Sequence, residues 1–227
     1  MKVFVYSILL TVLSFCSNPK KKDSAIDYSG FQEKKIVVAG LNEDYKQKDT
    51  LATLTINIPQ RLDTFYQWQD FSDCKNCGYS KYRFSDRHYP QFSESGFFYS
   101  IQPDSTYQFN IWHKPFRDAP DTIDLKPLSE KILDTYAYYQ TIAVSYDTNK
   151  INYRIKEFKV INGRLFIISA FYSNAGYLTW KPALFVIATT TLKSRELRFI
   201  AECSAKDTAG FIESMYKSIL SIKVNER

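Results

Sequence analysis

The C-terminal third of the chain constrains the fold most strongly. Arg164–Tyr172 and Ala183–Thr191 are continuous apolar runs with the length of β-strands. Both are apolar on their two faces, which is typical of strands that are covered on both sides. A further segment, Ile151–Ile161, precedes them and leads into the dipeptide Asn162-Gly163, a strong signal for a tight hairpin turn. We therefore predict consecutive strands from Ile151 to Ala205.

The last strand of this block, Arg195–Cys203, has an alternating pattern. One of its faces is apolar and the other is largely polar. Leu197, Phe199, Ala201 and Cys203 share the first face, and Glu196, Arg198 and Glu202 share the second, which Ile200 interrupts. A helix is predicted to follow from near Asp207. Phe211, Met215 and Ile219 recur every four residues in it, the spacing of a helix that packs on a sheet.

Upstream segments extend the same architecture. Leu51–Ile58 alternates like a half-buried strand and stops at Pro59, which cannot donate to a strand ladder. The apolar residues of Leu128–Val144 recur at helical spacing. Further short strands are expected at Ile36–Ala39, Tyr79–Phe84, Phe97–Ile101, Thr106–His113 and Leu220–Val224. The fold class predicted from this order is α+β, with a central and mainly antiparallel sheet packed by helices.

The N-terminus has the pattern of an export signal. Met1-Lys2 is positively charged, and Val3–Phe15 is apolar apart from Ser and Thr, which is too short for a stable membrane anchor. Leu13-Ser14-Phe15-Cys16 resembles a bacterial lipoprotein signal, with Phe15 in place of the usual small residue. The resemblance implies cleavage before Cys16 and lipidation of that cysteine; an uncleaved N-terminal anchor and an ordinary secretory signal are the alternatives.

These features divide the chain into three parts. We expect a signal peptide over residues 1–15, a lipidated tether over 16–35 and a single α+β domain over 36–227. The tether is polar and contains Lys20-Lys21-Lys22. The resulting prediction is a protein held in the bacterial cell envelope by the lipid on Cys16. The outer membrane is favoured, because Ser17 follows the cysteine where an Asp would retain such a protein at the inner membrane.

Two C-terminal segments resemble a known family. Ile161–Tyr172 (INGRLFIISAFY) and the closing segment Phe211–Val224 are similar to the PsbP-like superfamily, as is the Leu51–Pro59 strand. That superfamily includes extrinsic photosystem subunits, a Ran-binding nuclear-import factor and bacterial lipoproteins. The resemblance implies an α/β/α sandwich and a binding or assembly role for an unknown protein or small-molecule partner. It implies no enzyme activity, catalytic residue or cofactor.

Composition argues against several other functions. The formal charge of +6 is spread along the chain without a nucleic-acid-binding motif, so we expect no nucleic-acid partner. Only 7 glycines are present, and neither GxGxxG nor GxxxxGK[ST] occurs. The chain has 2 histidines, so a Ser-His-Asp set would depend on His88 or His113.

Cys74-Lys75-Asn76-Cys77 is the sharpest local motif, and it is open to three interpretations. In an exported protein we expect a disulfide that closes a small loop. A redox-active pair and a zinc site are the alternatives. Zinc would need further ligands from His88, His113 and Cys203, but Cys203 lies on the apolar face of its strand and is expected to be a buried thiol.

The region Phe65–Phe116 is dense in aromatic residues. We expect these residues to cover a sheet and the underside of its loops. The alternative function is a carrier of a small apolar ligand that stacks on aromatic side chains. The candidate residues for that ligand site are Tyr66, Trp68, Tyr82, Phe98 and Trp112.

Overall fold

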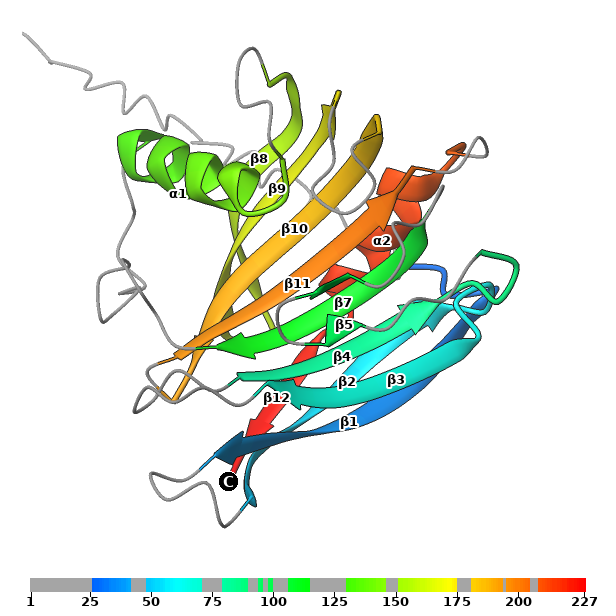
Figure 1. Ribbon diagram of the computed structural model, residues 1–227. Coiled ribbons are helices and arrows are strands. Elements are labelled where there is room, and N and C mark those ends of the chain that lie inside the picture. Colours follow the sequence, from blue (N-terminus) through cyan, green and yellow to red (C-terminus); the bar gives the residue numbers. More distant parts are fainter. Residues whose placement is uncertain are drawn as a thin grey trace, which may run out of the picture.

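The computed structural model describes residues 26–41, 48–70, 79–89, 94–95, 98–99, 106–114, 130–145, 151–174, 181–193, 195–204 and 208–227. A seven-stranded sheet dominates this part of the chain, and all its neighbouring strands are antiparallel (Figure 1). Its order is β3 (Thr64–Asp70), β4 (Tyr79–Ser85), β7 (Tyr107–Lys114), β11 (Arg195–Cys203), β10 (Ala183–Leu192), β9 (Arg164–Ser173) and β8 (Tyr153–Ile161). The predicted α+β class and mainly antiparallel sheet are confirmed.

The predicted C-terminal strands are confirmed almost to the residue. β9 and β10 are buried on both faces, as their apolar sequences indicate. β8 turns into β9 through Asn162 and Gly163, whose φ angles of 49° and 79° match the two positive-φ positions of a type I′ hairpin. The Asn162 side chain also donates a hydrogen bond of 2.7 Å to the Ile222 carbonyl, which ties this hairpin to the end of the chain.

The expected sandwich of helices around one sheet is wrong. One face of the large sheet is covered mainly by a second sheet, in the order β1 (Phe31–Leu41), β2 (Lys48–Pro59) and β12 (Lys223–Glu226), together with α2 (Phe211–Leu220). The other face carries α1 (Glu130–Ile142), which packs on β8 and β9 (Figure 1). The apolar side of the β1–β2 hairpin covers the face on which a helix was expected. The protein is therefore rich in β-sheet.

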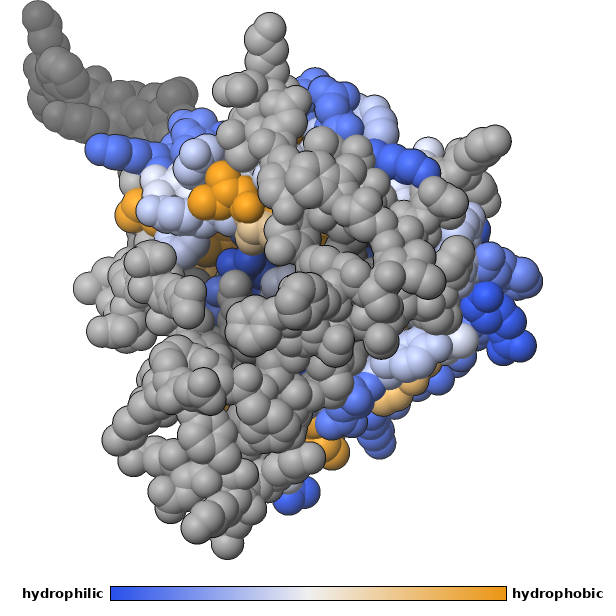
Figure 2. Space-filling view, in the orientation of Figure 1, coloured by the Kyte–Doolittle hydropathy of each residue, from blue (hydrophilic) through white to orange (hydrophobic). Residues whose placement is uncertain are grey.

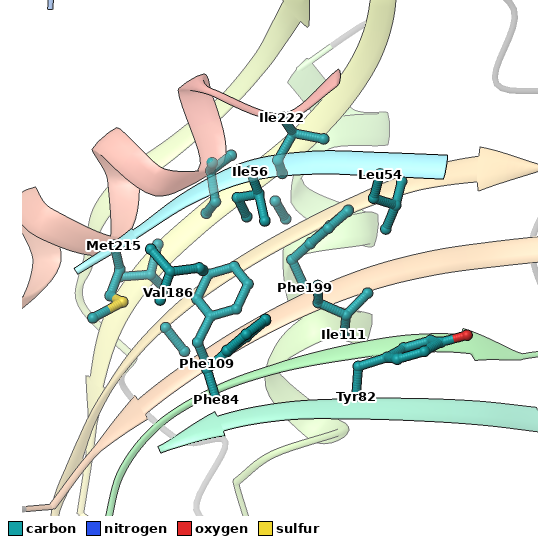
Figure 3. Packing of buried hydrophobic residues seen from close by; sticks show 14 of the residues in the cluster. Leu54, Ile56, Tyr82, Phe84, Phe109, Ile111, Val186, Phe199, Met215 and Ile222 are labelled. Carbon is teal, nitrogen blue, oxygen red and sulfur yellow. The ribbon is translucent and has the colours of Figure 1, made fainter. Parts of the chain in front are cut away.

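The main hydrophobic core lies between the two sheets. Alternate residues of β2 point into it, as the Leu51–Ile58 pattern predicts, and they meet aromatic side chains of β4, β7 and β11 (Figure 3). Phe211, Met215 and Ile219 form the predicted stripe of α2, and all three are fully buried in this core. Neither helix in the described part of the chain is both long and apolar enough to cross a membrane.

Other boundaries differ from the sequence predictions. β1 begins at Phe31, so the last five residues of the expected 16–35 tether belong to the folded domain. β3 was not predicted as a separate strand, and the short pair β5 (Glu94–Ser95) and β6 (Phe98–Tyr99) forms its own two-stranded sheet. The predicted last strand Leu220–Val224 shifts to β12, because α2 continues to Leu220.

Polar side chains of β4 fasten β1 to the large sheet. The Tyr82 hydroxyl donates to the Val37 carbonyl at 3.0 Å and accepts from the Ala39 N–H at 3.2 Å. Ser80 Oγ donates to the Ala39 carbonyl at 3.0 Å. The β1–β2 register shifts between Val38 and Ala39, so these bonds satisfy backbone groups beside an irregularity in the ladder. These hydrogen bonds fix the position of β1 on the large sheet. Apolar packing alone would not fix it, because the hydrophobic effect is non-directional.

We predict that Tyr82→Phe lowers the free energy of unfolding by about 1–3 kcal/mol, because it leaves the part-buried Val37 carbonyl and Ala39 N–H without their partner. Tyr66→Phe is the matched control, since Tyr66 is 43% exposed on the neighbouring strand. It should change stability by less than about 0.5 kcal/mol. Equilibrium urea unfolding of both variants measures the difference. Equal stability of the two variants would show that the Tyr82 hydroxyl does not fasten β1.

Candidate functional site

The side of the large sheet that faces α1 carries polar residues across β4, β7 and β11. Alternation along each strand places them together, and we call them the polar face. Apart from the half-buried Trp112, each is at most 7% exposed. Its members are Lys81, Arg83 and Ser85 on β4, Gln108, Asn110 and Trp112 on β7, and Glu196, Arg198 and Glu202 on β11.

Hydrogen bonds link the strands of the polar face. Arg83 Nε donates to Asn110 Oδ1 at 2.7 Å, between β4 and β7. Gln108 Nε2 donates to Glu202 Oε2 at 3.0 Å, between β7 and β11. Both bonds are buried, and each pairs a charged group with an amide. An amide next to a charge can rotate or exchange partners, so this arrangement can accommodate a polar ligand without leaving a bare charge.

Glu196 and Arg198 form a buried ion pair on β11. The two residues share one face because they are two positions apart, and Arg198 Nε donates to Glu196 Oε1. Their side chains are only 7% and 9% exposed. Arg198 Nη1, another donor of the same guanidinium, is buried and has no hydrogen-bond partner. A buried donor without an acceptor is costly, which makes this atom a feature that the fold alone does not explain.

Helix α1 borders the polar face next to this ion pair. Gln140 is buried, and its Nε2 donates to Thr189 Oγ1 at 2.9 Å and to the Ile167 carbonyl at 3.1 Å. Thr189 is the strand partner of Arg198. Tyr136 lies one turn before Gln140, and its hydroxyl is buried without a hydrogen-bond partner. Burial and the negative charge of Glu196 raise the pKa of Tyr136, so its hydroxyl stays protonated and remains a donor.

The structure places Tyr82 and Trp112, two residues of the alternative aromatic ligand site, on opposite sides of the large sheet. Tyr82 is fully buried in the core on the opposite side of the sheet. Trp112 lies on the polar face, where Lys81 Nζ is 4.8 Å from its ring centre. Tyr66 and Trp68 belong to β3, where Tyr66 is in register with Arg83 and Trp68 with Lys81. Phe98 belongs to β6, which pairs with β5 alone.

The histidines and cysteines do not converge either. His113 and Cys203 face the core at opposite ends of the β7–β11 ladder, six positions apart, or about 20 Å at the rise of a strand. They cannot bind one zinc ion. Cys203 is a buried thiol outside any disulfide, as predicted. Cys16, Cys74 and Cys77 lie outside the described residues, and within those residues no three His, Cys, Asp or Glu side chains are grouped to hold a metal.

His88 belongs to a separate cluster around Asp86. The buried Asp86 carboxylate accepts from Arg61 Nε at 2.6 Å and from the backbone N–H of His88 at 2.8 Å, and it contacts His88 Nδ1 at 2.8 Å. Burial raises the pKa of Asp86, but the hydrogen bonds from Arg61 and His88 outweigh it and leave the pKa below its ordinary value. Arg61 also donates to the Tyr89 hydroxyl at 3.1 Å. The cluster stabilises the turn after β4.

Sequence reasoning missed the polar face as a site. The alternation of Glu196, Arg198 and Glu202 was visible, but polar alternation ordinarily marks a face in contact with solvent. A signal was nevertheless present. Three strands each combine an apolar face with a face that contains Arg, Glu, Gln or Asn. Such a shared polar face indicates a candidate binding site once its strands are known to lie at the centre of a sheet.

Comparison with known proteins gives a structural likeness only. No family model matches the chain, and no curated protein matches its sequence. The fold is similar to the solution structure of cyanobacterial PsbP (CyanoP) from Synechocystis sp. PCC 6803, with 9% sequence identity and a TM-score of 0.43. The match covers 91% of this chain and 99% of that one.

We predict that His113 makes the protein less stable in mild acid. Burial lowers its pKa from 6.5 to about 4, against the hydrogen bond to the Leu192 carbonyl, which raises it. The unfolded state therefore binds more protons between pH 6.5 and pH 4, and this group should remove about 3 kcal/mol of stability as the pH falls through that window. His113→Gln should flatten the pH dependence of unfolding there and leave it parallel to wild type above pH 7. An unchanged acid slope would contradict the prediction.

The buried ion pair should show strong coupling. Arg198→Met leaves the Glu196 carboxylate buried, and we expect it to cost about 3–5 kcal/mol of unfolding free energy. The double variant Glu196→Gln, Arg198→Met should be more stable than Arg198→Met, because it buries no unpaired charge. Lys217→Met is the matched control, since Lys217 makes an exposed 3.2 Å pair with Glu213 and should change stability by less than about 1 kcal/mol. A double variant no more stable than Arg198→Met would refute the coupling.

Proposed function

We propose that the chain is a non-catalytic binding or assembly module, tethered to a bacterial cell envelope by a lipid on Cys16, and that it binds its partner at the polar face. One observation carries the binding role, namely that charged and amide side chains are buried on a sheet face that could be apolar. On the same side of the sheet, Phe171, Phe185 and Ile187 form an apolar layer under α1. The fold therefore has no need for charges there.

The distribution of charge supports a polar partner. The described residues of the polar face include three cations, Lys81, Arg83 and Arg198, and two anions, Glu196 and Glu202. Charges of both signs beside amides and an indole can recognise a ligand or peptide by directed hydrogen bonds, and burial strengthens such bonds. This chemistry suits a polar partner better than the small apolar ligand considered as the alternative.

A non-catalytic role rests on the placement of the histidines. His113 points into the core, and its Nε2 is 3.2 Å from the Leu192 carbonyl, so it is not accessible to a substrate. His88 is exposed at a turn that Asp86 and Arg61 hold in place. A general base needs a nucleophile or substrate proton within hydrogen-bond reach, and neither histidine supplies that arrangement at the polar face.

The tether is the part of the proposal that rests on sequence. With β1 starting at Phe31, about 15 residues separate it from Cys16, and their reach is at most about 50 Å when fully extended. Several acyl chains on one cysteine exceed what stable anchoring needs. The domain would then stand off the bilayer, within reach of a partner in the envelope.

We predict that the mature protein lacks residues 1–15 and carries acyl groups, because the signal is cleaved before a lipidated Cys16. Intact mass measurement and membrane fractionation check this. Cys16→Ala should abolish the lipid mass and release the protein from the membrane fraction, whereas Ser17→Ala should leave both unchanged. Membrane association that persists in the Cys16→Ala variant would refute the tether.

The binding role has its own test. A photo-crosslinking amino acid at Tyr66, exposed on β3 beside Arg83, should capture a discrete partner in living cells. The same group at Val160, 62% exposed on β8 at the far edge of the sheet, should not. A protein partner would appear as a shifted band and a small molecule as a mass adduct. Absence of a product at Tyr66, or equal products at both positions, would overturn the assignment of the polar face.

A further inference from the structure

The junction of α1 and β11 contains two unpartnered donors in one neighbourhood. Arg198 Nη1 and the Tyr136 hydroxyl are both buried and have no hydrogen-bond partner among the described residues. Gln140 locates them relative to each other. It bonds to Thr189, the strand partner of Arg198, and it lies one helical turn, about 5.4 Å, from Tyr136. Burial and the negative charge of Glu196 raise the pKa of Tyr136, in agreement with this placement. We call Tyr136, Gln140, Glu196 and Arg198 the α1–β11 corner.

Neither Arg198 Nη1 nor the Tyr136 hydroxyl has a hydrogen-bond acceptor among the described residues. The Glu196 carboxylate is engaged by Arg198 Nε, and the Gln140 carbonyl oxygen accepts from Ser169 Oγ at 2.6 Å. Nη1 lies at the other end of the guanidinium plane from the Nε–H, so Glu196 does not satisfy it. An unmade bond to a charged donor in a buried place is costly, and it becomes favourable when a ligand supplies the acceptor.

We propose that the α1–β11 corner binds a small carboxylic acid whose carboxylate accepts hydrogen bonds from Arg198 Nη1 and the Tyr136 hydroxyl. The inference rests on the proposed binding function and names the ligand class. A carboxylate is planar and offers two acceptor oxygens, which matches a guanidinium corner and a phenol donor. A phosphate dianion would bring a second negative charge next to Glu196.

The surroundings define the rest of the ligand. Trp112 is the strand partner of Arg198 and is half-buried, and it packs against the apolar layer that includes Ile200. An apolar or aromatic body attached to the carboxylate would lie against this indole. Both donors are buried, so the corner has to open locally to admit the acid. Figure 2 shows hydrophilic residues directly below α1.

The probe for this site is benzoate, with benzamide as its uncharged isostere and inorganic phosphate as the competing anion. We expect saturable benzoate binding to the full-length protein by titration calorimetry, with benzamide at least about tenfold weaker and phosphate without effect. Tyr136→Phe removes one hydroxyl that has no partner in the fold, so it should keep the thermal midpoint. It should weaken benzoate binding about tenfold, the equivalent of one hydrogen bond.

Two further variants separate binding from structure. Tyr139→Phe, at a 44% exposed position of the same helix, should bind benzoate like wild type. Arg198→Lys keeps the charge but removes Nη1 and should weaken benzoate more than benzamide. Equal affinity for benzoate and benzamide, no saturable benzoate binding, or equal effects of Tyr136→Phe and Tyr139→Phe would each overturn the carboxylate assignment. Phosphate binding with the same dependence on Tyr136 would overturn it in favour of a general oxyanion site.

The two proposals can fail separately. A crosslink at Tyr66 without benzoate binding would keep the polar face as a binding surface and remove the acid-binding corner. Benzoate binding that depends on Tyr136, without a crosslink at Tyr66, would keep the corner and restrict the binding role to a small acid.

Discussion

The burial of β11 on both faces is the constraint on which the rest of the structure depends. Its apolar face, with Leu197 and Phe199, packs into the core between the two sheets, and its polar face presents Glu196 and Arg198 to α1. Because side chains alternate along a strand, a shift of one residue would exchange the two faces completely. The core therefore fixes the register of β11, and the register in turn fixes the site. The register of β11 thus determines both which of its residues enter the core and which lie on the polar face.

Stability and function are separated across the thickness of the sheet. The core side is apolar and supplies the hydrophobic free energy, with Tyr82 and Ser80 fixing the position of β1. A buried ion pair such as Glu196–Arg198 contributes little net stability, because desolvation offsets most of the attraction between the charges. The polar face is thus poorly explained by folding requirements. Retention of costly groups at such a place is the physical argument for binding there.

Local periodicity explains which parts of this fold could be predicted. β9, β10 and the stripe of α2 were found because their own residues carry the pattern. The second sheet was not found, because the polar start of β1 (FQEKK) resembles a tether until its partner is known. The candidate ligand residue Tyr82 lies in the core for a related reason. The position of the second sheet decides which face of β4 packs inward, and it places Tyr82 in the core and Arg83 on the polar face.

The attachment of α1 explains how a buried site could open without unfolding the protein. Within α1 only Ala137, Gln140 and Thr141 are buried, so the helix contributes little apolar area to any core. In its C-terminal half it is fixed by the hydrogen bonds of Gln140 and the 2.7 Å contact between Thr141 Oγ1 and the Tyr153 hydroxyl. Its N-terminal half is held to β8 by the ion pair between Asp134, which is 55% exposed, and Lys156. Elements with few buried apolar contacts open at the lowest free energy, and an ion pair near the surface contributes little stability. Movement of the first turns of α1 away from Arg198 would therefore break this pair while the core between the sheets, on the opposite side of β11, stays intact.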